Sequence, residues 1–149
     1  MAENPDNLRL VHSILAKWER GNFAWVEWAH PLIEYDIADE PGSEVGWGVA
    51  AMGRKWRDFL TAWDDYHVAA DEYRELDGER VLVGLTARGR GKASGVDIGA
   101  TGGRRSASVF HLRRGKVTRL VSYFDRNRAF DDVGIGAACH AGDGQRPAV

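Results

Sequence analysis

The stretch "GKVTRLVSYFDRNRAFDDVGI", residues 115–135, decides the fold of this chain of 149 residues. Residues 116–124 have the composition of a strand, and with residues 104–112 they flank a tight turn that contains Gly115. Asp125 is placed to cap a short helix, which carries its apolar side chains on one side and ends at Gly134. The stretch therefore predicts the second strand of a hairpin followed directly by a short helix.

A second hairpin precedes the first one along the chain. Two strand-like segments, residues 66–76 and 79–90, flank the dipeptide Asp77-Gly78. Asp-Gly between two such segments is the strongest short-range signal of a hairpin, because both residues tolerate the positive φ that a tight turn needs. The second half of the chain is therefore predicted to hold four strands in antiparallel hairpins.

The first half has the three- and four-residue apolar spacing of helices. This spacing, with turn and capping residues, predicts helices over 5–20, 23–29 and 49–63, with one strand over 31–39. Six tryptophans are many for a chain of this length. Five of them fall in the predicted helices and indicate an aromatic-rich cavity or a thick core: Trp18, Trp25, Trp28, Trp56 and Trp63.

This order of elements predicts an α+β fold in which helices cover one face of a curved sheet. We expect one domain over residues 1–135, because no linker or repeat divides the chain. Residues 136–149 are rich in glycine and alanine without periodicity, and we expect them to form a disordered tail.

The composition argues against several classes of partner. A net charge of −2 gives no general attraction to nucleic acid or to anionic membranes, and no apolar run is long enough to span a bilayer. The N-terminal segment "MAENPDN" lacks the pattern of a secretory signal, and the single Cys139 excludes an intrachain disulfide. We therefore expect a cytoplasmic protein that binds neither nucleic acid nor membrane.

Three segments carry a resemblance to a known family: "LAKWERGNFAWV", the "GVAAM" that opens the helix over 49–63, and residues 115–135. With this layout, the chain resembles the nuclear transport factor 2-like superfamily, specifically its SnoaL-like branch. The resemblance implies a cone-shaped α+β barrel with a mostly antiparallel sheet and one pocket between sheet and helices. It often implies a homodimer through the sheet, but it implies no particular reaction.

The resemblance also suggests a general base. "DEPGSEVGWGVAAM", residues 39–52, aligns without a gap with steroid delta-isomerases and puts Asp39 at the position of their base. Strand alternation places Tyr35 and Asp39 on one apolar face, with Asp36 on the other. We expect a pocket at Asp39 to raise its pKa. The donor positions of those isomerases fall on Ile14 or Leu15 and on Ser108, so steroid isomerase activity is not expected.

Polyketide cyclases of the SnoaL type use a His and an Asp, which align here with Ser108 and Ser122. These hydroxyls either orient a ligand or make room for one. Six further side chains are predicted to line the same cavity around an apolar, ring-bearing ligand: Trp18, Tyr35, Trp56, Phe110, Leu120 and Phe124.

Other polar residues have structural interpretations. Alternation places His111 opposite the pocket, so it is not expected to pair with Asp125, and the scattered histidines show no metal-ligand spacing. The glycines follow no nucleotide-binding pattern, and we expect neither a metal nor a cofactor. Arg88, Arg90 and Lys92 share one side of a strand, as an anion-binding rim or, as we prefer, a solvated strand end.

Three hypotheses of function remain. The first is a small-molecule-binding domain with an aromatic pocket. The second is an isomerase, cyclase or dehydratase that acts on a cyclic or polyketide-like substrate with Asp39 as its base. The third is a dimeric scaffold or adaptor. A homodimer through the outer sheet face is predicted in any case, with Val109, Val121 and Tyr123 at the contact, because a monomer would expose them.

Overall fold

A computed structural model of the chain describes residues 5–23, 27–39, 42, 44–92, 95 and 104–134. The elements are α1 (Pro5–Glu19), β1 (Ala29–Ile37), β2 (Gly46–Trp47), α2 (Val49–Thr61), β3 (Trp63–Asp77), β4 (Arg80–Gly91), β5 (Arg104–Arg113), β6 (Lys116–Tyr123) and α3 (Arg126–Val133). The predicted tail over 136–149, Trp25 and Cys139 lie outside the described residues.

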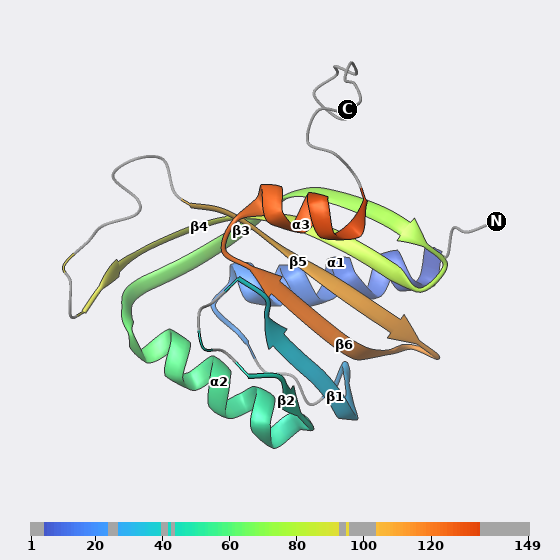
Figure 1. Ribbon diagram of the computed structural model, residues 1–149, viewed down its shortest axis with the longest axis horizontal. Helices are drawn as coiled ribbons and strands as arrows, with labels where there is room; N and C mark the ends of the chain where they lie inside the picture. The colour runs from blue at the N-terminus through green and yellow to red at the C-terminus, as the bar shows by residue number, and fades with distance from the viewer. Residues whose placement is uncertain are drawn as a thin grey trace, which may run out of the picture.

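The strands form one six-stranded sheet in the order β2-β1-β6-β5-β4-β3. All neighbours are antiparallel except β1 and β6, which run parallel. The sheet is curved and not closed, since β2 and β3 are its two edges (Figure 1). The α+β class and the mostly antiparallel sheet are therefore confirmed.

The helices lie on both faces of the sheet, with α1 behind it and α3 in front of it in Figure 1. One core lies between the sheet and α1 and α2, and holds the buried side chains Ile14, Trp18 and Phe110. The second core lies on the opposite, outer face, where Ala129 and Phe130 of α3 cover the sheet. The predicted cap and end of α3 are confirmed: the Asp125 side chain accepts from Asn127 N at 2.9 Å, and Gly134 is left-handed.

Two predictions about the first half of the chain are wrong. The helix over 23–29 does not form at its described end, where Trp28 lies in a turn and Ala29 begins β1. The carbonyl of Trp28 instead accepts a hydrogen bond of 2.8 Å from the amide of Val117 at the start of β6. The helix over 49–63 ends at Thr61, so Trp63 belongs to β3 and pairs with Gly91.

Candidate ligand-binding cavity

A cavity lies between the inner face of the sheet and the helices α1 and α2. It encloses about 70 Å³ that the centres of water molecules can occupy, which is room for about five waters or a small ring system. Its described lining residues are Trp18, Phe23, Tyr35, Ile37, Trp56, Phe59, Leu60, Trp63, Tyr66, Val68, Leu85, Ala87, Arg104, Ser106, Ala107, Ser108, Ser122, Tyr123 and Phe124.

Aromatic rings from helices and strands form most of the cavity wall. Trp18 of α1 packs against Trp56 of α2 with ring centroids 4.9 Å apart, and Phe23 lies 5.2 Å from Trp56. On the other side, Phe59 meets Tyr66 edge-on at 5.1 Å. Because these rings contact one another, the walls are already in place without a ligand.

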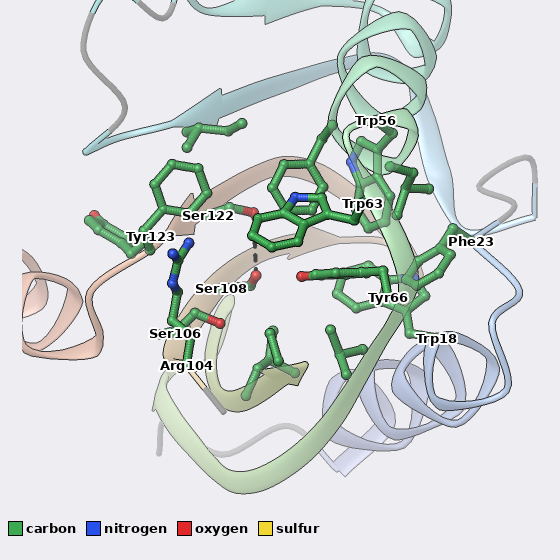
Figure 2. A pocket seen from close by; sticks show the side chains of 18 of the residues that line it. Trp18, Phe23, Trp56, Trp63, Tyr66, Arg104, Ser106, Ser108, Ser122 and Tyr123 are labelled. Atoms are coloured by element: carbon green, nitrogen blue, oxygen red, sulfur yellow. Dashed lines mark hydrogen bonds between the residues drawn. The ribbon is translucent and has the colours of Figure 1, made fainter. Parts of the chain in front are cut away.

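The polar groups of the cavity gather on the sheet side. Ser108 of β5 and Ser122 of β6 are direct cross-strand neighbours, and their Oγ atoms lie 3.3 Å apart. Figure 2 shows the hydroxyl of Tyr66 pointing toward Ser108. Burial raises the pKa of Tyr66 to about 12, although the charge of Arg104 acts in the opposite direction. Tyr66 therefore stays protonated at neutral pH and can donate a hydrogen bond.

Arg104 is the one charged side chain among the described residues that line the cavity. Its guanidinium carbon lies 5.9 Å from the ring centroid of Trp63 and 5.7 Å from that of Phe124, within the range of cation–π contacts. Figure 2 shows it at the same wall as Ser106. Arg104 thus adds a positive charge to the polar side of a cavity whose other walls are mostly aromatic.

Two buried donors in the lining residues lack a protein acceptor. The indole Nε1 atoms of Trp18 and Trp56 are buried, and within the described part of the chain neither has a hydrogen-bond partner. A buried donor left unpaired costs about 1–3 kcal/mol, so such groups are rare without a water or a ligand to satisfy them. Because both atoms have essentially no accessible surface, they lie within the packed aromatic wall rather than at the surface of the cavity.

Asp39 does not face the cavity, and that prediction is wrong. Its Oδ1 accepts a hydrogen bond of 2.8 Å from the amide of Phe124, and its Oδ2 accepts one of 2.9 Å from the amide of Asp125. Asp39 is absent from the residues that line the cavity. Both carboxylate oxygens are thus used to join the end of β1 to the turn between β6 and α3, and the geometry gives no support to a general base there.

The structure places six of the eight predicted ligand-binding residues at the cavity wall; whether they bind a ligand stays a prediction. Those six are Trp18, Tyr35, Trp56, Ser108, Ser122 and Phe124. Phe110 and Leu120 belong to the same inner core but are fully buried and are not among the lining residues. The ring of Phe110 is covered by Trp18, whose centroid lies 5.6 Å away, so Phe110 and Leu120 do not reach a guest.

Sequence reasoning missed Arg104, Tyr66 and Trp63 as lining residues. The alternation that placed Ser108 on the inner face of β5 continues backward through Ser106 to Arg104, so this signal was present. Trp63 was missed because it was assigned to a helix. Arg88, Arg90 and Lys92 are exposed and stand outside the cavity lining, in line with a solvated strand end.

The structure of the outer face contradicts the argument that a monomer would expose apolar strand residues there. Val109 and Val121 lie opposite the cavity, as predicted, whereas Tyr123 is also among the residues that line it. All three belong to the core that α3 covers, and they are only 2%, 5% and 6% exposed. A monomer therefore does not expose these side chains. His111 lies on this face as well, and Asp125 caps α3 rather than pairing with it.

Two features are absent from the described residues. Those residues contain no group of three or more His, Cys, Asp or Glu side chains that could hold a metal ion. None of their helices has the length and apolar character needed to span a bilayer.

No protein-family model and no curated protein matches this chain. Solved structures do. A nuclear transport factor 2-like protein of unknown function from Burkholderia pseudomallei is 18% identical with a TM-score of 0.68, and the match covers 85% of this chain and 95% of that one. A proposed SnoaL-like polyketide cyclase from Jannaschia sp. CCS1 is 13% identical with a TM-score of 0.68, over 82% and 89% of the two chains. TerC, co-crystallised with polyporic acid, is 19% identical with a TM-score of 0.65, over 86% and 97%.

At identities this low, the likeness defines the fold alone. The chain has the nuclear transport factor 2-like fold, in the form that SnoaL-like proteins share. The likeness assigns no ligand and no reaction to this chain.

Proposed function

We propose that this protein is a small-molecule-binding domain whose cavity takes a planar, ring-bearing ligand. The observation that carries the proposal is the cavity itself, with aromatic walls on Trp18, Trp56 and Phe59 and hydroxyl groups on its sheet side. Ligand sites are mostly apolar, with a few polar groups that fix orientation, and this cavity has that composition. The crystal structure of TerC with polyporic acid, a protein of the same fold with a small organic molecule, supports this proposal.

Acid–base catalysis receives no support from the described lining residues. They include no Asp, Glu, His, Lys or Cys, and Tyr66 holds its proton. A general base needs a pKa near the working pH and a position within hydrogen-bond reach of the substrate. The binding domain is therefore preferred over an isomerase or cyclase. A homodimer and a cytoplasmic location stay predictions.

Isothermal titration calorimetry with 2-naphthamide tests the proposal, since this probe is a neutral, planar two-ring molecule. Binding by the unchanged protein supports a ring-binding cavity. Ala87→Phe should abolish it, because Ala87 lines the cavity and is only 3% exposed, so a phenyl ring there fills the space. Ala69→Phe is the matched control, since Ala69 is exposed on the neighbouring strand.

Thermal unfolding of both variants shows whether each still folds. If Ala87→Phe does not fold, Ser122→Leu fills the same cavity from β6 and replaces it in the test. Absence of heat with the unchanged protein, or equal binding by the filled and unfilled forms, would overturn the proposed function.

A further inference from the structure

Among the described residues, the charge in the cavity is positive. Of its described lining residues, Arg104 carries the only charge, and none of them is a carboxylate. The hydroxyls of Tyr66, Ser108 and Ser122 can donate a hydrogen bond to a ligand or accept one. A ligand that presents an anionic oxygen is therefore complementary to the charge of Arg104, whereas a cationic ligand would be repelled by it.

The guanidinium of Arg104 is held by aromatic rings. The rings of Trp63 and Phe124 lie within 6 Å of its guanidinium carbon, at the 5.9 Å and 5.7 Å given above. Among the described residues, no acidic side chain forms an ion pair with it, whereas Arg126 on the outer face is paired with Asp71 at 2.8 Å. Contact with aromatic rings leaves hydrogen-bond donors of a guanidinium available, and its planar fork matches a carboxylate.

Resting on the proposed function, we propose that the cavity selects ring-bearing ligands that carry an anionic oxygen group, a carboxylate or an ionised phenol or enol. The ring lies between the aromatic walls, and the oxygen group binds the guanidinium of Arg104. The cavity thereby discriminates against neutral and cationic ligands of the same shape.

A pair of probes of equal shape tests the selectivity. Calorimetry at pH 7 compares 2-naphthoate with 2-naphthamide, which differ in charge but hardly in size. Hydrogen bonds to charged groups are stronger than neutral ones by about 1.4 kcal/mol, which corresponds to tenfold in affinity, so 2-naphthoate should bind about tenfold tighter. Arg104→Gln keeps a polar side chain but removes the charge, and it should reduce this ratio to about one by weakening 2-naphthoate more than 2-naphthamide.

Arg105→Gln is the matched control, because Arg105 is exposed on the opposite face of the same strand. It should leave the ratio unchanged. Equal affinity of the unchanged protein for the two probes would overturn the anion selectivity and leave the ring-binding function standing. An equal loss of both probes in Arg104→Gln would also overturn it, since Arg104 would then only pack. Failure of both probes to bind the unchanged protein would overturn the function and the selectivity together.

Discussion

The carboxylate of Asp39 works as a clamp between two segments that are far apart in the chain. Each of its oxygens accepts one backbone N–H, from Phe124 and from Asp125. These amides precede α3, where the chain leaves the sheet and no strand partner is available for them. The clamp therefore replaces strand pairing at the point where β6 ends.

Asp39→Asn should lower the free energy of unfolding by about 1–2 kcal/mol, because an amide offers one acceptor oxygen where two are used. Urea unfolding at pH 7 measures the change. Asp36→Asn is the control on the same segment, since Asp36 accepts neither of these two hydrogen bonds. Equal unfolding midpoints for the two variants would show that the clamp contributes nothing.

Single residues also show which side-chain directions can be predicted from the sequence and which cannot. Alternation correctly predicted Tyr35 and Ser108 at the cavity, because both lie inside regular strands. The same rule failed for Asp39, because β1 ends at Ile37 and the two-residue period ends with it. The direction of a side chain just beyond a strand depends on its hydrogen-bond partners, and these come from a distant part of the chain.

At the scale of elements, Arg126 fastens α3 to three strands of the outer face. Its Nη1 lies 2.8 Å from a carboxylate oxygen of Asp71 on β3, and its Nη2 donates to the carbonyl of Leu85 on β4 at 2.7 Å. Its Nε donates to the carbonyl of Ser106 on β5 at 3.1 Å. A Cβ on Gly84 would lie only 2.8 Å from the guanidinium carbon, so Gly84 makes room for this contact.

Gly84→Ala should therefore destabilise the protein by about 1–3 kcal/mol, because the buried guanidinium must leave its partners. The same change should cost clearly less in a chain that already carries Arg126→Met. Chemical unfolding of the two single variants and the double variant gives the coupling energy. Strictly additive effects would mean that Gly84 and Arg126 do not depend on each other.

Elements with local signals were predictable. The cap Asp125, the final Gly134 and the Asp77-Gly78 turn each act on neighbours in sequence, and the structure has α3 and both hairpins where they were expected. The wrong helix near Trp28 has a different cause. Its carbonyl is bound by Val117, a residue far along the chain, and this contact outweighs local helix preference.

At the scale of the whole molecule, α3 decides what the outer face can do. The sequence indicates the apolar side of α3, but strand alternation alone assigns the residues beneath it to a dimer contact. Because α3 folds back over Val109 and Val121, the second core belongs to one chain. The homodimer stays a prediction, which light scattering tests, but the buried face no longer argues for it.

The stability of the whole molecule should depend on pH through His111. Burial lowers the pKa of His111 to about 4, and the charges of Arg119 and Arg80 act in the same direction, against Asp77 and Glu79. The unfolded chain binds this proton near pH 6.5, so stability is complete above that pH and falls as the pH drops toward 4. Asp71 and Asp77, with pKa values below the ordinary 3.8, act only at lower pH.

His111→Gln should flatten the decline in unfolding free energy between pH 6.5 and pH 4. Urea unfolding across this range measures it, with His67→Gln as the control, because His67 is exposed. Identical pH profiles for the unchanged protein and His111→Gln would exclude His111 as the source of the decline.

The composition of the cavity wall determines how ligand binding can depend on pH and how acidic a bound ligand becomes. Its described side chains are aromatic, aliphatic, serine and one arginine, and none of these ordinarily changes charge between pH 5 and about 9. Any pH dependence of binding in that range therefore reports the titration of the guest molecule. If the ionised guest binds about tenfold tighter, the bound guest is a stronger acid by about one pH unit. The protein would then promote ionisation of a weakly acidic phenol simply by enclosing it.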